Sequence, residues 1–292
     1  MQSLGLGGQG DKIMNILASD LSMKFDDVLA LDSISFSTNS NRLAIIGQNG
    51  SGKTTLLSLI AGLLKPTSGH MAVNDFDPYK SRKRAINSVS FMFEKIKFPY
   101  RIKVREFIDF LEMDHSGKDK EELVSALGID SLLEKRMYSL SSGEEQILSI
   151  LNLLCSPTDI LLLDEPFTHL DIFRISRIYK EIVDLKQDII ITTHIPEEAE
   201  SIGEFFIIID KGKIVWKGSK QDLINSDIFE VYAAGTFPDS LKIIYRYGST
   251  ALVRSPLEDL YDLVKEQKII GFRKSGVRRV YNEIDESNKM VF

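Results

Sequence analysis

Runs of apolar residues mark the strands and helices in the first part of the chain. Residues 13–25 and 30–37 have the periodicity of strands, with Asp26 and Asp27 as turn residues between them. Residues 42–46 form a short apolar strand, and residues 54–64 show helical spacing. A glycine-rich segment separates these two, so the pattern predicts the order strand, loop, helix.

The middle of the chain predicts helices. Residues 105–111 and 120–127 show helical spacing with charged faces, which indicates a mostly helical insert between about residues 98 and 140. Residues 144–154 form a further helix with a wide apolar stripe.

Three strongly apolar runs follow, and each has the length of a strand. They are residues 160–163, 189–192 and 205–210, with a hairpin strand at 213–217 after the turn Lys211-Gly212. Apolar strands that alternate with helices predict an α/β fold with a mostly parallel sheet covered on both faces.

The pattern changes from about residue 226. Residues 241–247, 250–253, 269–272 and 278–281 resemble strands, and residues 256–265 resemble a helix. We therefore expect a flexible tail at 1–12, a main domain at 13–225 and a small α+β domain at 226–292. The GxGxxG pattern at residues 5–10 is assigned to the tail because no strand precedes it.

Composition and charge limit the function classes. The formal net charge of −6, together with ten basic and ten acidic residues in 226–292, offers no electrostatic case for nucleic acid as a partner. The single cysteine, Cys155, excludes an intrachain disulfide and fits a reducing compartment. The longest apolar runs are far shorter than the roughly 18 residues of a membrane span, so any membrane role is expected to come through a partner.

The glycine-rich segment matches the phosphate-binding pattern GxxxxGK[ST]. Its backbone amides and the amino end of the next helix suit phosphate oxygens. Lys53 is predicted to reach the β- and γ-phosphates and Thr54 to bind Mg²⁺. The nucleotide-binding residues predicted here are Gly47, Gln48, Asn49, Gly50, Ser51, Gly52, Lys53, Thr54 and Thr55.

Two carboxylates follow the apolar run 160–163. In a parallel sheet this strand ends beside the phosphate loop, so Asp164 is predicted to hold Mg²⁺ and Glu165 to polarise the attacking water. The alternative is an acid pair that caps a helix.

Taken together, these motifs resemble the ABC ATPase family over about residues 13–224. Residues 140–144 stand where the family has its LSGGQ signature, residues 168–171 resemble its D-loop, and His194 resembles its switch histidine. By this resemblance, Phe25 stacks on adenine, His194 joins Glu165 in catalysis, and Ser141, Ser142, Gly143 and Asp171 belong to the ATP site.

Two places depart from the family pattern. Glu94 occupies the position of the Q-loop glutamine, where a carboxylate is still able to ligate Mg²⁺. In the signature, Ser142 replaces a glycine and Glu144 replaces the glutamine, which adds a side chain and a negative charge near a helix start. We expect slower hydrolysis rather than an inactive protein.

The resemblance implies an ATP- and Mg²⁺-dependent ATPase subunit of a transporter, with a P-loop ABC fold of parallel core, antiparallel β subdomain and helical subdomain. It implies a second ATPase subunit, a separate membrane-spanning permease, and a place on the cytoplasmic face of the membrane. The carboxy-terminal unit resembles the tail of exporter subunits.

The main alternative is an ABC ATPase without a transporter, of the type that acts in iron–sulfur assembly. A translation factor would need two phosphate loops, and a DNA-repair protein would need a long coiled coil. A non-catalytic binder is disfavoured because Lys53, Asp164, Glu165 and His194 are all present.

Overall fold

The computed structural model describes residues 13–93, 101–111, 119–224 and 227–277. The predicted tail at 1–12, the metal-ligand candidate Glu94 and the predicted strand at 278–281 lie outside the described residues.

A six-stranded sheet forms the centre of the main domain. Its strand order is β5-β6-β7-β3-β8-β9, and every neighbouring pair is parallel except β8 with β9. The four central strands, β6, β7, β3 and β8, are apolar and largely buried, as the sequence predicted, whereas the edge strand β9 is mostly exposed. Their bounds are β3 (Arg42–Ile46), β5 (Val89–Met92), β6 (Ile160–Asp164), β7 (Asp188–Thr193), β8 (Phe205–Asp210) and β9 (Lys213–Ser219).

A smaller antiparallel sheet shares an apolar core with α1 (Lys53–Ile60) and one face of the central sheet. Its order is β2-β1-β4, from β1 (Asn15–Phe25), β2 (Val28–Asn39) and β4 (Ser68–Val73). The predicted turn between β1 and β2 is confirmed, and Asp26 adopts a positive φ of 48° there. The strand β4 was not predicted from the sequence.

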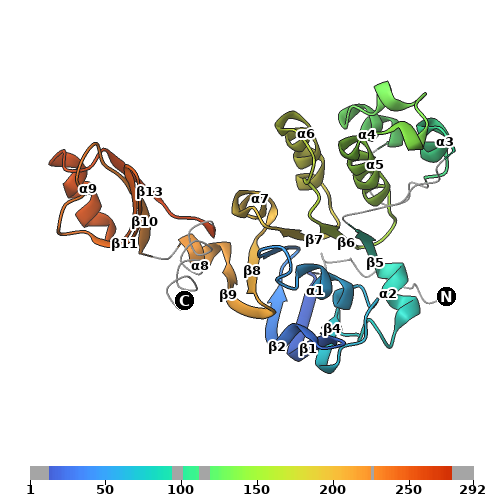
Figure 1. Ribbon diagram of the computed structural model, residues 1–292, viewed down its shortest axis with the longest axis horizontal. Helices are drawn as coiled ribbons and strands as arrows, with labels where there is room; N and C mark the ends of the chain where they lie inside the picture. Colours follow the sequence, from blue (N-terminus) through green and yellow to red (C-terminus); the bar gives the residue numbers. More distant parts are fainter. Residues whose placement is uncertain (1–12, 94–100, 112–118, 225–226, 278–292) are drawn as a thin grey trace, which may run out of the picture.

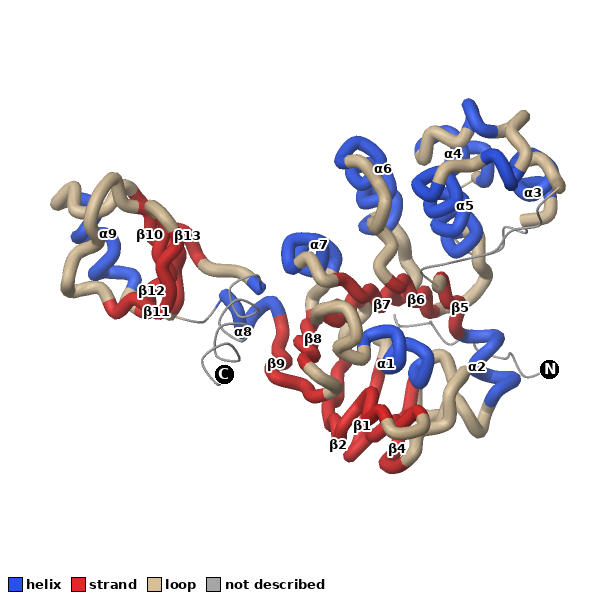
Figure 2. The backbone as a smooth tube through the Cα atoms, viewed as in Figure 1, coloured by secondary structure: helices blue, strands red, loops and turns tan. Residues whose placement is uncertain are grey.

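Helices cover both faces of the parallel sheet, as Figures 1 and 2 show. The helix α1 (Lys53–Ile60) packs with β1 and β2 on one face. On the opposite face lie α5 (Ser142–Leu154), α6 (Ile172–Val183) and α7 (Pro196–Ile202). The first helix ends four residues before the predicted end, since Gly62 takes a left-handed φ of 70° there.

Short helices complete the main domain. The described part of the predicted helical insert contains α3 (Val104–Asp109), α4 (Lys120–Ala126) and two 3₁₀ turns, η1 (Asp130–Leu132) and η2 (Met137–Ser139). The helix α2 (Arg82–Ser88) precedes β5, and α8 (Lys220–Ile224) follows β9.

Residues 228–274 form a second antiparallel sheet with its own apolar core. The strand order is β11-β12-β10-β13, and α9 (Leu257–Lys265) packs on one face. The strands are β10 (Ile228–Tyr232), β11 (Lys242–Tyr247), β12 (Thr250–Arg254) and β13 (Gly271–Lys274). After β13 the chain returns to the main domain, where Val277 is fully buried in the larger core.

Among the residues that the structure describes, no helix has both the length and the apolar character needed to cross a membrane.

Candidate active site

The phosphate-loop sequence connects β3 to α1, in the arrangement that the sequence predicted. Gly52 has a φ of 110°, and a Cβ at this position would lie 2.6 Å from the Ala30 carbonyl oxygen. Only glycine fits both constraints. The next residue, Lys53, starts α1, so the positive amino end of the helix faces the loop.

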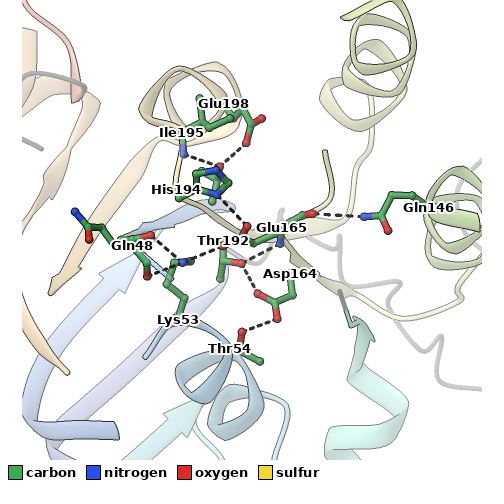
Figure 3. Close-up of polar contacts among 12 residues, drawn as sticks. Gln48, Lys53, Thr54, Gln146, Asp164, Glu165, Thr192, His194, Ile195 and Glu198 are labelled. Carbon is green, nitrogen blue, oxygen red and sulfur yellow. Dashed lines mark hydrogen bonds and ion pairs between the residues drawn. The ribbon is translucent and has the colours of Figure 1, made fainter. Parts of the chain in front are cut away.

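Lys53 is the buried cation of the site, with 5% of its surface exposed. Its Nζ donates to the carbonyl oxygens of Gly47 and Gln48 at 2.8 and 3.1 Å, and it pairs with Glu165 Oε1 at 2.9 Å. Figure 3 shows the ammonium group between the loop and the end of β6. A buried ammonium with three oxygen partners is held at a defined place.

Two hydroxyl groups hold the Asp164 carboxylate at the end of β6. Thr54 Oγ1 donates to Oδ2 at 2.7 Å, and Thr192 Oγ1 donates to Oδ1 at 2.5 Å. The parallel pairing of β6 with β7 places Asp164 directly beside Thr192. Asp164 is 2% exposed and carries oxygen ligands together with Thr54, which is the donor set that Mg²⁺ prefers.

Glu165 lies between Lys53 and His194. Its Oε1 accepts the Lys53 ion pair, and its Oε2 lies 2.9 Å from His194 Nδ1. The Glu165 side chain is 13% exposed, whereas that of His194 is 46% exposed. The carboxylate is therefore fixed from two sides while one edge of the site remains open to solvent.

Glu198 fixes the start of α7 behind the histidine. Its carboxylate accepts a short hydrogen bond from Thr193 Oγ1. Thr193 Oγ1 in turn accepts a hydrogen bond from the Ile195 amide at 3.0 Å. Burial raises the pKa of Glu198 above its usual value, although the Thr193 bond and the nearby His194 oppose this. Glu198 was not predicted as a site residue from the sequence.

A cavity of about 490 Å³ opens at the phosphate loop. It combines the apolar β2 residues Val28, Leu29 and Ala30 with loop residues, Glu165 and the Lys211-Gly212 turn. Phe25 is not among the lining residues; it is 43% exposed and pairs in register with Val28. The predicted loop residues on the wall are Asn49, Gly50, Gly52, Lys53, Thr54 and Thr55.

The signature-like residues build the start of α5. Ser141 is the N-cap, and its hydroxyl accepts from the Glu144 amide while the Glu144 carboxylate accepts from the Ser141 amide at 2.9 Å. This reciprocal pair is a capping box. Gly143 packs on the backbone of His169, where a Cβ would lie 2.8 Å from the carbonyl oxygen.

The charge of Glu144 is paired within the chain. Lys135 Nζ donates to Glu144 Oε1 at 2.8 Å. Burial acts to raise the pKa of Glu144, but the bonds from Lys135 and Ser141 outweigh it and leave the pKa below its usual value. The negative charge that Glu144 adds near the start of this helix is thus paired with the Lys135 ammonium group.

Asp171 caps α6, because its carboxylate accepts from the amides of Phe173 and Arg174, each at 3.0 Å. None of the described residues 140–144 nor Asp171 lines the cavity at the phosphate loop. The structure thus brings together Lys53, Thr54, Asp164, Glu165 and His194, and places the signature elsewhere on the same chain.

Sequence reasoning missed two residues that touch the site through polar contacts. Thr192 holds both Asp164 and the Glu165 amide, and Gln146 donates to the carbonyl oxygens of Glu165 and Pro166. Thr192 sits inside a predicted strand and Gln146 inside a predicted helix. Neither position carries a motif of its own, so only the fold reveals them.

Known proteins similar to this chain match most of its length. The family model described as "ABC transporter" matches residues 31–168. The chain is 30% identical to the ABC transporter ATP-binding protein NatA of Bacillus subtilis, over 73% of this chain and 92% of that protein. It is 33% identical to the sulfate/thiosulfate import ATP-binding protein CysA of Bradyrhizobium diazoefficiens, over 84% of this chain and 75% of that protein.

The fold is also similar to that of solved cassettes. One is the ATP-binding cassette MJ0796 in a dimeric post-hydrolysis state bound to ADP and Pi, with a TM-score of 0.58 and 21% identity. The match covers 70% of this chain and 98% of that one. The predicted α/β fold is therefore confirmed.

Proposed function

This chain belongs to the family of ABC transporter ATP-binding proteins, and on that premise we propose that it hydrolyses ATP to drive a transporter whose membrane-spanning part is a separate permease. The observation that carries the proposal is the convergence of Lys53, Thr54, Asp164, Glu165 and His194 at one end of the parallel sheet. These groups come from the start of α1, the end of β6 and the end of β7, and each has the chemistry that phosphoryl transfer requires.

Phosphate binding falls to the loop and to Lys53. Loop amides and the amino end of α1 stabilise the phosphate oxygens, and the Lys53 ammonium faces the β- and γ-phosphates. In that role Lys53 exchanges its bond with Glu165 for bonds to phosphate, which releases the carboxylate toward the reacting water. The apolar wall of Val28, Leu29 and Ala30 suits the flat face of adenine, with Phe25 beside it.

Thr54 and Asp164 are the residues proposed to hold Mg²⁺, and Glu94 is a further candidate from the sequence. Thr54 Oγ1 and Asp164 Oδ2 lie 2.7 Å apart. The Asp164 side chain is buried and is oriented by its hydrogen bond from Thr192. When bound, the metal neutralises charge on the β- and γ-phosphates.

Glu165 is proposed to orient and polarise the attacking water, and to accept its proton as the water oxygen bonds to the γ-phosphorus. The bond between that phosphorus and the bridging oxygen breaks, and ADP and phosphate leave. His194 holds Glu165 Oε2 and is placed to contact the γ-phosphate region.

A second copy or a related subunit is proposed to complete each ATP site. Ser141, Ser142, Gly143 and Asp171 do not line the cavity of their own chain, which agrees with their contacting the nucleotide of the opposite subunit. The similar MJ0796 cassette is dimeric with ADP and Pi bound. The permease would hold this pair at the cytoplasmic face of the membrane.

Export is the proposed direction of transport, and it rests on the layout in which a small α+β unit follows the cassette. Relatives named for import, such as CysA, share the cassette, so the cassette itself does not decide direction. ATP-dependent uptake of a substrate into inverted membrane vesicles would support export. ATP-dependent uptake of that substrate into intact cells would contradict it. The iron–sulfur alternative is not favoured, because the relatives compared above are named for transport.

The test of the proposed function is Glu165→Gln, which keeps the shape of the side chain and removes its basicity. We expect turnover to fall by about 10²–10⁴-fold while ATP affinity is retained. Light scattering should then show an ATP-dependent dimer and no dimer with ADP. Turnover near the wild-type value would remove Glu165 from the mechanism.

A further inference from the structure

The backbone of Glu165 has an unusual conformation. Its φ is +45°, in the left-handed region, which a residue with a Cβ adopts only at a cost of about 1–3 kcal/mol. The following residue is Pro166, and a proline pushes the preceding residue toward extended conformations. Such a conformation persists only where the surroundings hold it from several sides.

Two neighbouring elements hold this peptide. On the amide side, Glu165 N donates to Thr192 O at 3.2 Å and to Thr192 Oγ1 at 3.1 Å. On the carbonyl side, the Gln146 side chain donates from Nε2 to Pro166 O at 2.9 Å and to Glu165 O at 3.4 Å. Figure 3 shows Gln146 reaching from α5 to this segment.

Gln146 is well placed to act as a fixed support. It is 6% exposed and lies in the second turn of α5, the helix whose first turn is closed by the Ser141–Glu144 capping box. Neither of its bonds goes to a side chain that the proposed chemistry uses. Both go to the backbone that sets the direction of the Glu165 carboxylate.

We infer that Gln146 is a positioning residue for ATP hydrolysis, which holds the strained Glu165–Pro166 backbone so that the Glu165 carboxylate faces the attacking water. The inference rests on the proposed role of Glu165. Without the two bonds, the peptide relaxes toward the extended conformation that Pro166 favours, and the carboxylate moves away. A displacement of about 1 Å in such a group costs about 10²-fold in rate.

Gln146→Met tests this, since methionine has the same length and is unbranched but donates no hydrogen bond. We expect kcat of Mg²⁺-ATP hydrolysis to fall by about 10–100-fold, with the calorimetric affinity for ATP unchanged. The affinity is retained because the phosphate loop and Lys53 keep their contacts.

The chain offers a matched control in Gln187. This glutamine is 8% exposed, and its Nε2 also donates to two backbone carbonyl oxygens, those of Ser156 and Thr158, at 3.0 and 3.2 Å. Gln187→Met should lower Tm as much as Gln146→Met does and leave kcat near the wild-type value. An equal loss of kcat in both variants would overturn the inference, because the effect would then be one of general stability.

A double variant separates a positioning role from an independent one. If Gln146 acts through Glu165, adding Gln146→Met to Glu165→Gln should cause no further loss of kcat. Multiplied losses would overturn the inference. If Glu165→Gln alone retains turnover, the proposed function fails at that step; if Glu165→Gln is inactive but Gln146→Met turns over normally, only the present inference fails.

Discussion

Single residues at this site carry charges that are buried and yet paired. Lys53 combines 5% exposure with two carbonyl oxygens and one carboxylate, and Asp164 combines 2% exposure with two hydroxyl donors. Burying such groups is tolerable only because each has partners with good geometry. The pairs also hold each side chain where phosphate and metal chemistry would use it.

Lys53→Ala is expected to abolish tight ATP binding. The ammonium makes charge-assisted bonds worth about 1.5–3 kcal/mol each, so losing two of them to phosphate lowers affinity by about 10²–10⁴-fold. Calorimetric titration with ATP measures this. Lys80→Ala is the control, since Lys80 is exposed and pairs with Asp77; an unchanged affinity in Lys53→Ala would refute the phosphate-loop assignment.

Asp188, at the other end of β7, is expected to make stability fall as pH rises. Burial raises its pKa from 3.8 to about 7, opposed by Arg42 and reinforced by Asp159. Because the folded-state pKa is the higher one, the folded state binds the proton more tightly, and stability declines between about pH 4 and pH 7. Asp188→Asn, a neutral mimic, should therefore gain Tm relative to wild type at pH 8 but not at pH 4.

That comparison is made by thermal unfolding at both pH values, with Asp184→Asn as an exposed control. A gap in Tm between Asp188→Asn and wild type that does not change with pH would show that folding does not raise the pKa of Asp188.

At the scale of elements, the start of α5 combines two functions. The capping box of Ser141 and Glu144 satisfies amides at the helix end, and Lys135 ties that end to the segment after η1. The same residues stand at the signature position of the family. Glu144 departs from the family pattern, and in this chain it closes the capping box and pairs with Lys135.

Glu144→Gln is expected to lower Tm by about 1–3 °C near neutral pH, because it removes a partly exposed ion pair worth about 0.5–1 kcal/mol. The folded-state pKa of Glu144 is depressed, so this stabilisation is present above about pH 4.5 and disappears as pH falls through the lower folded-state value. The gap to wild type should therefore close in acid.

Glu145→Gln is the matched control for this measurement, since it removes a neighbouring carboxylate and leaves the Lys135–Glu144 pair intact. If Glu145→Gln shows the same pH-dependent loss, the effect belongs to the negative charge at the helix start and not to the pair.

At the scale of the whole molecule, the carboxy-terminal sheet has its own apolar core, and the segment after it packs against the main domain. Its own core is formed by β10–β13 and α9. Val277 then packs into the larger core, and its amide donates to the Glu200 carboxylate on α7. A Cβ on Gly276 would collide with the same carboxylate, so the return is closely packed.

We expect a chain truncated after residue 225 to fold and to bind ATP with unchanged affinity, because every residue proposed to touch ATP precedes β9. Its Tm should be lower, since the Val277 contacts are lost. A chain that ends at Val277 keeps these contacts and is the control. Weaker ATP binding by a folded truncation would make the carboxy-terminal unit part of the site.

The sequence by itself determined the apolar strands of the central sheet and the position of the chemistry, but not β4, α6 or α7. Apolar runs predicted β3, β6, β7 and β8 closely, since strands buried on both faces leave a continuous local signal. The phosphate loop and the Asp164-Glu165 pair were readable because their function requires certain residue types at fixed local spacing.

Only the tertiary structure decided which residues support that chemistry. The roles of Thr192 and Gln146 depend on β7 and α5 lying beside the end of β6, contacts that join residues 27 and 19 positions apart. The partner of Glu144 likewise comes from another segment, nine positions away. Hydrogen bonds between distant segments carry no local periodicity, so the packed fold is what specifies them.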